Sequence, residues 1–393
     1  MNLGYAAAYD VKNPKMWSGT PYSLYRALET CGRLETLTDI DLSKHISEKD
    51  KKINQYKNLD LPATLKSRQF TAKAGAAVNN IVNSRALNSV LPGLNMDALL
   101  QIGGFKIDKP HLPYFVYSDA THDMTLDYYK KYGSLPFQFR SLTPDCFERA
   151  SKQVHSIYEN AAGIFCMSRW MADSLINTTG ISQEKVHIVY AGPNFHGYEN
   201  PLPASGKTHT AGSSPVNIAF VGVDYEAKGC GQLVAAVKLL NDSNERRYRL
   251  HIAGLKAENI PPDTADNDNI FIHGYLGKAS LFKLLGDSDL FVLPSLFDFF
   301  GIAFIEAMSF GLPCIGRNIC AMPEIIDEGV NGELLKDTDH RSLADLIVKI
   351  TGNKEIYEEY SRQAIRKSRL FSWDKTANKM LDVICKINET ASS

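Results

Sequence analysis

The chain has 393 residues, with 43 lysines and arginines against 44 aspartates and glutamates and a formal net charge of −1. At about 150 residues per domain, this length predicts two or three domains, each large enough for its own core. Hydrophobic residues make up 44% and charged residues 22%, which is typical of a globular protein and excludes a disordered one. The balanced charge argues against a dedicated nucleic-acid-binding protein, which would carry a basic excess.

Short apolar runs alternate with longer amphipathic stretches from one end of the chain to the other. The runs with strand character cover residues 3–8, 114–117, 163–167, 187–190, 217–221, 249–253, 269–273 and 290–293. Stretches with helical spacing of apolar residues lie between several of them, at 232–240, 278–285 and 302–310. Strands that alternate with helices in this way predict an α/β fold, with parallel sheets covered by helices on both faces.

A segment near the middle of the chain has the composition of a linker. Residues 196–215 contain three prolines with glycine, serine and threonine, and almost no large apolar side chain. They separate an amino-terminal α/β block, 1–195, from a second block, 216–372. The amphipathic helix expected at 373–388 needs a surface to pack on. A cleft between two such domains is a common place for a small-molecule site.

Cysteine usage and the amino-terminal residues predict a cytoplasmic location. The seven cysteines form no C-x-x-C pair, which excludes zinc-ribbon and thioredoxin motifs, and their odd number favours reduced thiols. The first residues carry no basic stretch before their apolar run, so no signal peptide is expected. The most apolar region, 290–308, is interrupted by Pro294, Asp298 and Glu306, which excludes a membrane-spanning helix there.

The polar stretch 43–85 is helix-prone and basic in places. It includes Lys51, Lys52, Lys57, Lys66, Arg68 and Lys73. One interpretation is a basic face that binds an anionic acceptor or a membrane surface. The other is an ordinary solvated helix, which is the commoner fate of a charge-rich stretch. We favour the solvated helix and keep peripheral membrane contact as the alternative.

The segment 289–324 places polar side chains where an α/β sheet binds ligands. Its apolar start predicts a buried strand, followed by a loop with Asp298 and a helix that begins at Gly301. In a parallel α/β sheet, the carboxyl ends of strands and the amino termini of the following helices line the binding crevice. The backbone N–H groups at Gly301 and Ile302 would suit a phosphate. Asp298 and Glu306 would accept hydrogen bonds from sugar hydroxyls, or else are a helix-terminal acid and a solvated side chain.

The order and spacing of several motifs resemble family 4 of the retaining glycosyltransferases. That family has two acids separated by seven residues, an AM-x-x-G-x-P stretch and a later Pro-Glu. The matching residues here are Asp298 and Glu306, Ala307 with Met308, Gly311, Pro313, and Pro323 with Glu324. Further matching runs are WSGTP at 17–21, YSDAT at 117–121, FCMSRWMADSL at 165–175, VGVDYEAKG at 221–229 and a terminal FSW-x-x-x-A.

This resemblance implies the GT-B fold, in which two Rossmann-like domains with parallel sheets face each other across a cleft. In the family the last helix crosses back to the amino-terminal domain. The resemblance also implies transfer of a sugar from a nucleoside-diphosphate sugar to an acceptor, with retention of the anomeric configuration. A UDP- or GDP-sugar would be the donor, and a glycan or lipid-linked glycan the acceptor. No metal or other cofactor is expected.

The resemblance assigns roles to individual residues. Glu306 would bind the ribose hydroxyls of the nucleotide, and Asp298 the hydroxyls of the donor sugar. Lys228 would lie on the diphosphate, where its charge offsets the negative charge that grows on the leaving group. Gly19 would let the backbone approach the phosphates, since a side chain there would block them. Considered alone, Lys228 and Gly19 are better explained as residues of ordinary surface turns.

Two more positions are candidates by resemblance. His122, after the strand predicted at 114–117, is the nearest candidate for the histidine that many relatives place near the sugar. His111 and His155 are alternatives, and a lone histidine is more often structural. Tyr275 lies where relatives contact the nucleotide base, or else it packs at the end of a strand.

Three features depart from the family pattern. The first acid is Asp298, which is shorter than the usual glutamate by one methylene. The arginine that often precedes the lysine is missing, with Val223 near its place, and Arg317 is the candidate that would replace it. Cys320 and Ala321 stand where the family has two glycines. These changes concern the identity of the donor.

Other classes of protein are compatible with parts of the pattern. A nicotinamide dehydrogenase also uses Rossmann-like domains, but no G-x-G-x-x-G follows a predicted strand. A sugar phosphorylase needs a lysine motif for pyridoxal phosphate, which is not found. A GT-B protein that binds a nucleotide sugar but has weakened or lost transfer fits the missing arginine and the change at Asp298. Turnover of a donor separates this alternative from an active enzyme.

Overall fold

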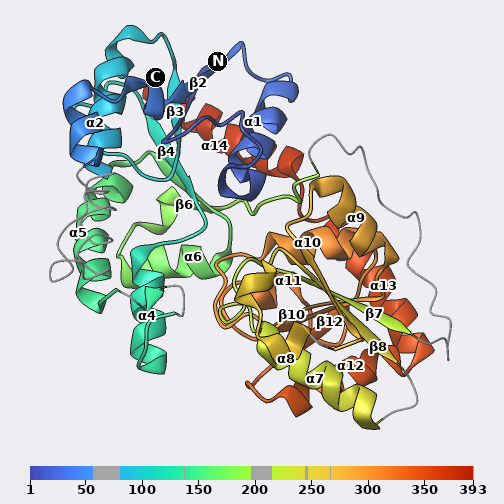
Figure 1. Ribbon diagram of the computed structural model, residues 1–393. Helices are drawn as coiled ribbons and strands as arrows, with labels where there is room; N and C mark the ends of the chain where they lie inside the picture. Colours follow the sequence, from blue (N-terminus) through green and yellow to red (C-terminus); the bar gives the residue numbers. More distant parts are fainter. Residues whose placement is uncertain are drawn as a thin grey trace, which may run out of the picture. The chain divides into compact units, whose positions relative to one another are not determined.

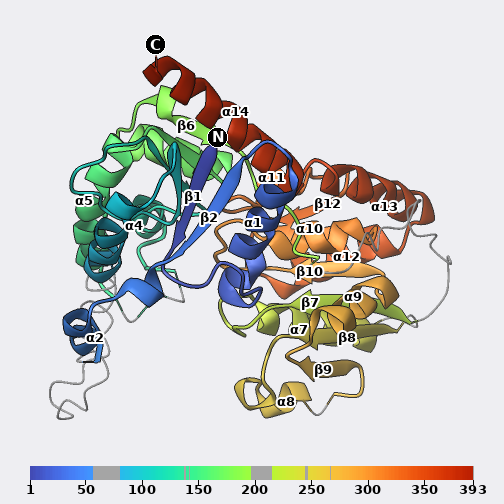
Figure 2. The same cartoon turned by 90° about the horizontal axis from the view of Figure 1, so that it is seen from above.

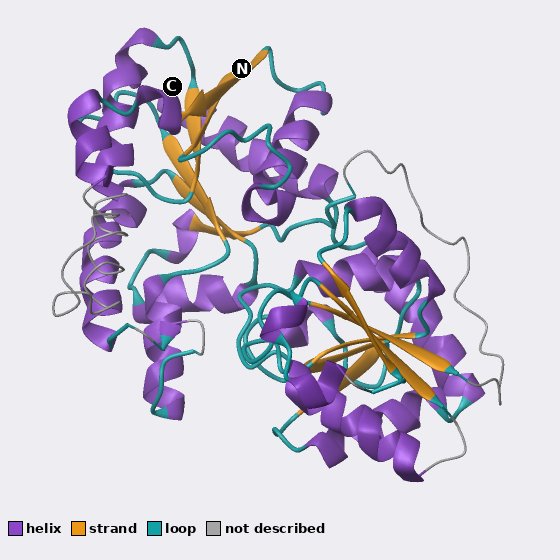
Figure 3. Cartoon of the chain, in the orientation of Figure 1, coloured by secondary structure: helices purple, strands orange, loops and turns teal. Residues whose placement is uncertain are grey.

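The computed structural model describes residues 1–55, 80–136, 139–140, 142–195, 215–243, 247–265 and 267–392. The chain forms two compact units, a first unit of Met1–Ala191 with Trp373–Ser393 and a second unit of Gly192–Ser372. Figures 1 and 3 show one sheet in each unit, with helices packed around it. The linker predicted at 196–215 lies outside the described residues except for Pro215, and so does most of the basic stretch, from 56 to 79.

The first unit is built on a six-stranded parallel sheet with the strand order β2-β1-β3-β4-β5-β6. Its strands are β1 (Asn2–Ala7), β2 (Thr36–Asp41), β3 (Ala98–Ile102), β4 (Tyr114–Ser118), β5 (Gly163–Cys166) and β6 (Val186–Ile188). Its helices are α1 (Thr20–Thr30), α2 (Glu48–Gln55), α4 (His122–Tyr132), α5 (Pro144–Asn160), α6 (Arg169–Asp173) and α14 (Trp373–Ser392). Short turns of 3-10 or π-helix are η1 (Met16–Gly19), η2 (Leu42–His45), η4 (Leu91–Gly93), η6 (Ser174–Thr178) and η7 (Gln183–Lys185).

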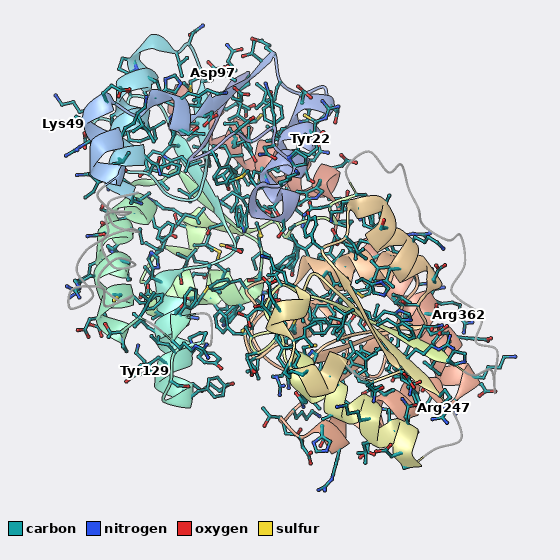
Figure 4. All side chains as sticks on the ribbon, in the orientation of Figure 1. Tyr22, Lys49, Asp97, Tyr129, Arg247 and Arg362 are labelled. Atoms are coloured by element: carbon teal, nitrogen blue, oxygen red, sulfur yellow. The ribbon has the colours of Figure 1, made fainter. Side chains whose placement is uncertain are left out.

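The central strands of this sheet are buried because helices cover both of its faces. Phe115 of β4 and Phe165 of β5 are fully buried, and their rings stack with centroids 5.6 Å apart. Tyr5 of β1 donates a hydrogen bond to the carbonyl of Pro21 in α1 at 2.9 Å. Asp97, labelled in Figure 4, accepts a hydrogen bond from the backbone N–H of Asn2 at 2.7 Å. These contacts hold β1 in its place between β2 and β3.

The terminal helix α14 belongs to the first unit, although the second unit precedes it in the sequence. It lies beside α1, as Figure 2 shows, and its buried stripe consists of Ala377, Met380, Leu381 and Ile384. Thr376 donates a hydrogen bond to the carbonyl of Val189 at 3.2 Å, and Arg33 pairs with Asp382 at 2.8 Å. The surface that this amphipathic helix needs is therefore provided by the first unit.

The second unit repeats the architecture with the strand order β12-β11-β10-β7-β8-β9, all parallel. Its strands are β7 (Val216–Val221), β8 (Tyr248–Ala253), β9 (Ile270–Gly274), β10 (Leu290–Leu293), β11 (Cys314–Arg317) and β12 (Gly332–Leu335). Its helices are α7 (Cys230–Ser243), α8 (Pro262–Ala265), α9 (Lys278–Asp287), α10 (Ile302–Ser309), α11 (Met322–Ile325), α12 (His340–Thr351) and α13 (Lys354–Ser368), with a 3-10 turn η8 (Ala257–Asn259).

The prediction of parallel sheets in an α/β fold is confirmed by both units. Each apolar run in the sequence overlaps a strand, and each of the three amphipathic stretches lies in α7, α9 or α10, apart from one residue at the end of α10. None of the seven cysteines takes part in a disulfide bond. Within the ranges described above, no helix combines the length and apolarity that crossing a bilayer requires.

Candidate functional site

The carboxyl ends of three strands in the second unit are drawn together by glycines. The N–H of Gly254, after β8, donates to the carbonyl of Gly274 at 2.7 Å, and the N–H of Gly222, after β7, donates to Ala253 at 3.0 Å. A Cβ on Gly254 would lie 2.4 Å from the carbonyl oxygen of Gly222, and its φ is +95°. Only glycine combines this backbone conformation with so close an approach. The loops after β7, β8 and β9 therefore start from one edge of the sheet, where α/β proteins bind ligands.

The loop after β7 is also fastened to the loop after β10. Gly229 has a φ of +68°, and a Cβ there would lie 2.4 Å from the carbonyl oxygen of Pro294. The N–H of Leu296 donates to the carbonyl of Ala227 at 2.9 Å. This close approach brings Lys228, from the first loop, to Asp298, in the second.

Lys228 and Asp298 form an ion pair at the carboxyl edge of the sheet. Lys228 Nζ lies 2.5 Å from Asp298 Oδ2, and the two side chains are 22% and 18% exposed. No other described residue donates a hydrogen bond to this carboxylate. The pair therefore offers a partly exposed ammonium group and one open carboxylate oxygen, which suit a ligand that carries both phosphate and hydroxyl groups.

Glu306 forms the second ion pair of this edge. It lies inside α10 and its side chain is 7% exposed, against 30% for Lys278, the first residue of α9. Its Oε1 accepts two hydrogen bonds, from Lys278 Nζ at 2.7 Å and from the backbone N–H of Asn194 at 3.1 Å. Among the described residues, none donates to Oε2. A nearly buried carboxylate thus keeps one oxygen for a ligand.

The helix α10 begins at a glycine that no other residue could replace without strain. Gly301 has a φ of +83° and a ψ of 48°, and a Cβ there would lie 2.7 Å from Cε of Met322. No side chain caps the helix, so the N–H groups at Ile302 and the next residue of the first turn are not bound by a capping side chain. The start of α10 therefore presents N–H groups that suit an anion, and the phosphate contact at Gly301 and Ile302 stays a prediction.

Arg317 has a different environment from the one predicted. The residue is 6% exposed and its guanidinium donates to the backbone carbonyls of Ser295, Pro294 and Asp337 and to Oε1 of Gln232. These donors hold the turn that follows β10. The geometry therefore indicates that Arg317 positions this loop, and it argues against the predicted contact of Arg317 with a diphosphate.

Two exposed side chains follow β7 and β9 at the same edge. Val223 is 74% exposed and Tyr275 is 79% exposed. The alternative interpretation of Tyr275, an aromatic ring packed at a strand end, is therefore wrong. Its ring is accessible to a ligand, while the exposed Val223 supplies no charge in place of the missing arginine.

The remaining candidates belong to the first unit. Gly19 has a φ of +92° and precedes α1, and Trp17 and Ser18 before it also have positive φ values of 43° and 57°. Such conformations in residues other than glycine are strained and occur most often at functional sites. His122 is the first residue of α4 and is half-buried, and burial lowers the pKa of its imidazole, which favours the neutral ring near pH 7.

The structure thus brings four charged side chains of the second unit together in two pairs, while Gly19 and His122 lie in the first unit. Sequence reasoning missed Lys278 and Asn194. Lys278 opens the helix that follows β9, so the same rule that identified Gly301 would have found it. Asn194 makes its contact through the backbone N–H, which nearly every residue type has, so the sequence could not predict it. Among the residues the structure describes, no group of three or more His, Cys, Asp or Glu side chains could hold a metal ion.

Part of the chain is similar to a known protein family. Residues 207–367 match the glycosyl transferases group 1. A D-inositol 3-phosphate glycosyltransferase from Xylanimonas cellulosilytica is 24% identical over 55% of this chain and 55% of its own length. The chain spans about half the length of curated relatives such as this one.

Solved structures show the same fold over the whole chain. Sucrose-phosphate synthase from Thermosynechococcus elongatus superimposes with a TM-score of 0.69 at 14% identity and covers 100% of both chains. WaaG, a glycosyltransferase involved in lipopolysaccharide biosynthesis, has a TM-score of 0.64 at 13% identity over 97% of this chain and 99% of its own. The narrower resemblance to family 4 stays a prediction. Residues 207–367 are thus similar to the glycosyl transferases group 1, and the chain as a whole has the GT-B fold.

Proposed function

We propose that this chain transfers a sugar from a nucleoside-diphosphate sugar to a hydroxyl acceptor with retention of the anomeric configuration. The observation that carries the proposal is the two lysine–carboxylate pairs at one edge of the second-unit sheet. Each carboxylate keeps one oxygen for a ligand, and Lys228 adds a partly exposed positive charge. A nucleoside-diphosphate sugar presents ribose hydroxyls, two phosphates and sugar hydroxyls in one molecule, so it matches all of these groups.

In this proposal each residue of the second unit has one role in donor binding. Glu306 binds the ribose hydroxyls through Oε2, and Asp298 binds hydroxyls of the donor sugar through Oδ1. The N–H groups at the start of α10 and the ammonium of Lys228 bind the diphosphate. The exposed ring of Tyr275 stacks on the nucleotide base. UDP- and GDP-sugars are the donors that we expect.

The chemical step follows from the charge that develops on the leaving group. The bond between the anomeric carbon and the phosphate oxygen breaks, and the acceptor oxygen bonds to that carbon on the same face. The proton of the acceptor hydroxyl passes to the departing phosphate oxygen, so no separate general base is required. Lys228 stabilises the negative charge on the diphosphate as the bond breaks. We propose that this cation and the first turn of α10 do this without a metal ion or another cofactor.

The acceptor is proposed to be a glycan or a lipid-linked glycan, handled on the cytoplasmic side of a membrane. The name of WaaG, which refers to lipopolysaccharide biosynthesis, supports this class of acceptor. In the first unit, Gly19 and the neutral His122 are the residues that we expect near the transferred sugar. For 43–85, peripheral membrane contact stays the alternative to an ordinary solvated helix. Of that stretch, Arg85 pairs with Asp50 at 2.8 Å.

The test is release of nucleotide from a panel of UDP-, GDP-, ADP- and dTDP-sugars, with and without EDTA. We expect slow hydrolysis of one donor by the wild-type protein, unchanged by EDTA and lost in Glu306→Ala. Glu258→Ala, which removes an exposed acid of the same unit, is the matched control and should keep the activity. For the hydrolysed donor, NMR of the anomeric proton should show retention in the product.

Each other outcome has a definite meaning. Binding of a nucleotide without turnover, with or without added acceptors, would favour the binding protein with lost transfer, for which the exposed Val223 is the structural argument. Absence of binding to every donor would show that the site is wrongly placed. An inverted product would contradict the retaining mechanism alone.

A further inference from the structure

The two oxygens of the Glu306 carboxylate have unequal environments. Oε1 accepts a hydrogen bond from Lys278 and another from the backbone of Asn194, at 2.7 Å and 3.1 Å. Oε2 receives no hydrogen bond from any residue that the structure describes. A carboxylate held at one oxygen cannot turn freely about its last bond, so its second oxygen points in one direction.

Lys278 is placed by its helix and by an aromatic neighbour. It is the first residue of α9, and its Nζ lies 5.4 Å from the ring centroid of Phe282, one turn further along the helix. A lysine loses much side-chain freedom when it is held in this way. An ion pair on an open surface does not repay this cost, but the partner here is only 7% exposed. The ion pair of Lys278 with Glu306 is therefore a structural part of the site and not an incidental surface contact.

The second donor to Oε1 comes from the segment that leads out of the first unit. Asn194 is fully buried, and the next residue, Phe195, packs its ring against Phe282 with centroids 5.2 Å apart. Phe282 therefore supports both groups that hold the Glu306 carboxylate. In Figure 1, α9 and α10 lie side by side, which brings these groups to the same place. The backbone N–H is a neutral donor, whereas Lys278 supplies the charge-assisted hydrogen bond, which is about twice as strong.

We propose that Lys278 is a positioning residue for the nucleotide: by holding Oε1 of Glu306 it directs Oε2 to the two hydroxyls of the ribose. The inference rests on the proposed function, in which Glu306 is the ribose ligand. When the 2′-hydroxyl is absent, Oε2 loses one of its two hydrogen bonds, and a carboxylate that is held at Oε1 cannot turn to make up the loss. Lys278 therefore increases the affinity for ribonucleotides relative to that for 2′-deoxyribonucleotides.

The experiment compares the affinity for UDP with that for 2′-deoxy-UDP by isothermal titration calorimetry, and likewise for the GDP and ADP pairs. We expect the wild-type protein to bind one ribonucleotide about tenfold more tightly than its deoxy form, the effect of one hydrogen bond to a charged group. Lys278→Ala should reduce this ratio to about twofold or less, mainly by weakening the binding of the ribonucleotide. Lys278→Arg, which keeps the positive charge, should keep most of the wild-type ratio. Lys283→Ala, in an exposed pair of the same helix, is the matched control and should leave the ratio unchanged.

The ratio separates positioning from other roles of Lys278. If Lys278 instead contacted the phosphates or the base, or if its loss disturbed the whole structure, Lys278→Ala would weaken the binding of both nucleotides equally. The ratio would then keep its wild-type value, and the inference would be overturned. If Lys278→Ala does not fold, as judged by thermal melting, Lys278→Met keeps the aliphatic stem and serves instead. If the wild-type protein binds no nucleotide, the proposed function fails and the inference fails with it. Binding that discriminates equally well in Lys278→Ala sinks the inference alone.

Discussion

The two units share an architecture but differ in the chemistry at the carboxyl edge of their sheets. In the second unit this edge holds two ion pairs that are largely withdrawn from solvent. In the first unit it holds phenols: Tyr117 donates to the carbonyl of Tyr190 at 3.0 Å, and Tyr9 follows β1. Burial, together with the nearby carboxylate of Asp119, raises the pKa of Tyr9 and of Tyr117, so both phenols keep their protons.

This difference separates two kinds of ligand. Fixed positive charges and open carboxylate oxygens suit a charged ligand with hydroxyls, as a nucleoside-diphosphate sugar is. Protonated phenols and a neutral imidazole at His122 suit an uncharged polyhydroxyl compound, which they bind by hydrogen bonds and ring contacts. The same fold therefore carries two lysine–carboxylate pairs at this edge in one unit and protonated phenols next to Asp119 in the other.

The largest effect is expected from Lys228→Ala, which removes the cation of the second-unit edge. The value of kcat for donor turnover should fall by about 10²–10³, the usual result of deleting one group that stabilises charge in the transition state. The matched control is Lys12→Ala in the first unit, whose ammonium pairs with Asp39 at 2.7 Å. Steady-state nucleotide release measures both. A loss in Lys12→Ala as large as that in Lys228→Ala would break the comparison between the two edges.

A second prediction concerns the glycines after β8 and β3. Gly254 and Gly103 both have a positive φ, +95° and +87°, but a Cβ on Gly254 would meet a carbonyl oxygen at 2.4 Å while a Cβ on Gly103 meets nothing within 4 Å. Gly103→Ala should cost about 1–2 kcal/mol for the left-handed backbone alone. Gly254→Ala should cost more than about 3 kcal/mol, because the backbone must also move.

Urea unfolding followed by circular dichroism measures these costs, and the ribonucleotide affinity of each variant is measured in parallel. Only Gly254→Ala should lower the affinity, since it displaces the loop after β7. Equal costs at the two positions would show that the tight junction of β7, β8 and β9 is not what holds the second-unit edge together.

The fold was predicted more fully than the site, for a physical reason. Parallel strands that are buried on both faces have continuous apolar sequences, as β10 and β7 do. Such runs can be recognised in the sequence without knowledge of the structure. Four of the described strands were not predicted: β2, β3, β11 and β12. The sequence of β2, TLTDID, is polar and its first residues are not buried, whereas β3, ALLQI, is a fully buried apolar run that the same pattern should have identified. Arg317 shows the limit for sites: its side-chain partner, Gln232, comes from another helix, and no spacing in the chain predicts which group a long side chain reaches.

The smallest effect is expected from a histidine pair that lies in the second unit. His251 Nδ1 lies 3.1 Å from His273 Nε2, and the rings stack. Burial is the main cause that lowers the pKa of each, and for His251 the neighbouring His273 and Arg249 lower it further, while Asp287 and Asp289 oppose the shift. The unfolded chain therefore binds these protons at a higher pH than the folded unit does. The stability they provide is complete above the ordinary histidine pKa of about 6.5 and is lost as the pH falls through the folded-state values.

Thermal melting between pH 7.5 and pH 5 tests this prediction. The Tm of the wild-type protein should fall as the medium becomes acidic, and His273→Gln should flatten that dependence while lowering the Tm at pH 7.5 by about 2–4 °C, the effect of about 1 kcal/mol in a domain of this size. His340→Asn, at the start of α12 in the same unit, should keep the wild-type slope. The pair belongs to β8 and β9 and not to the lysine–carboxylate pairs, so nucleotide affinity at pH 7.5 should stay unchanged in His273→Gln. If affinity fell together with stability, the proposed donor site would extend further across this sheet than the two ion pairs indicate.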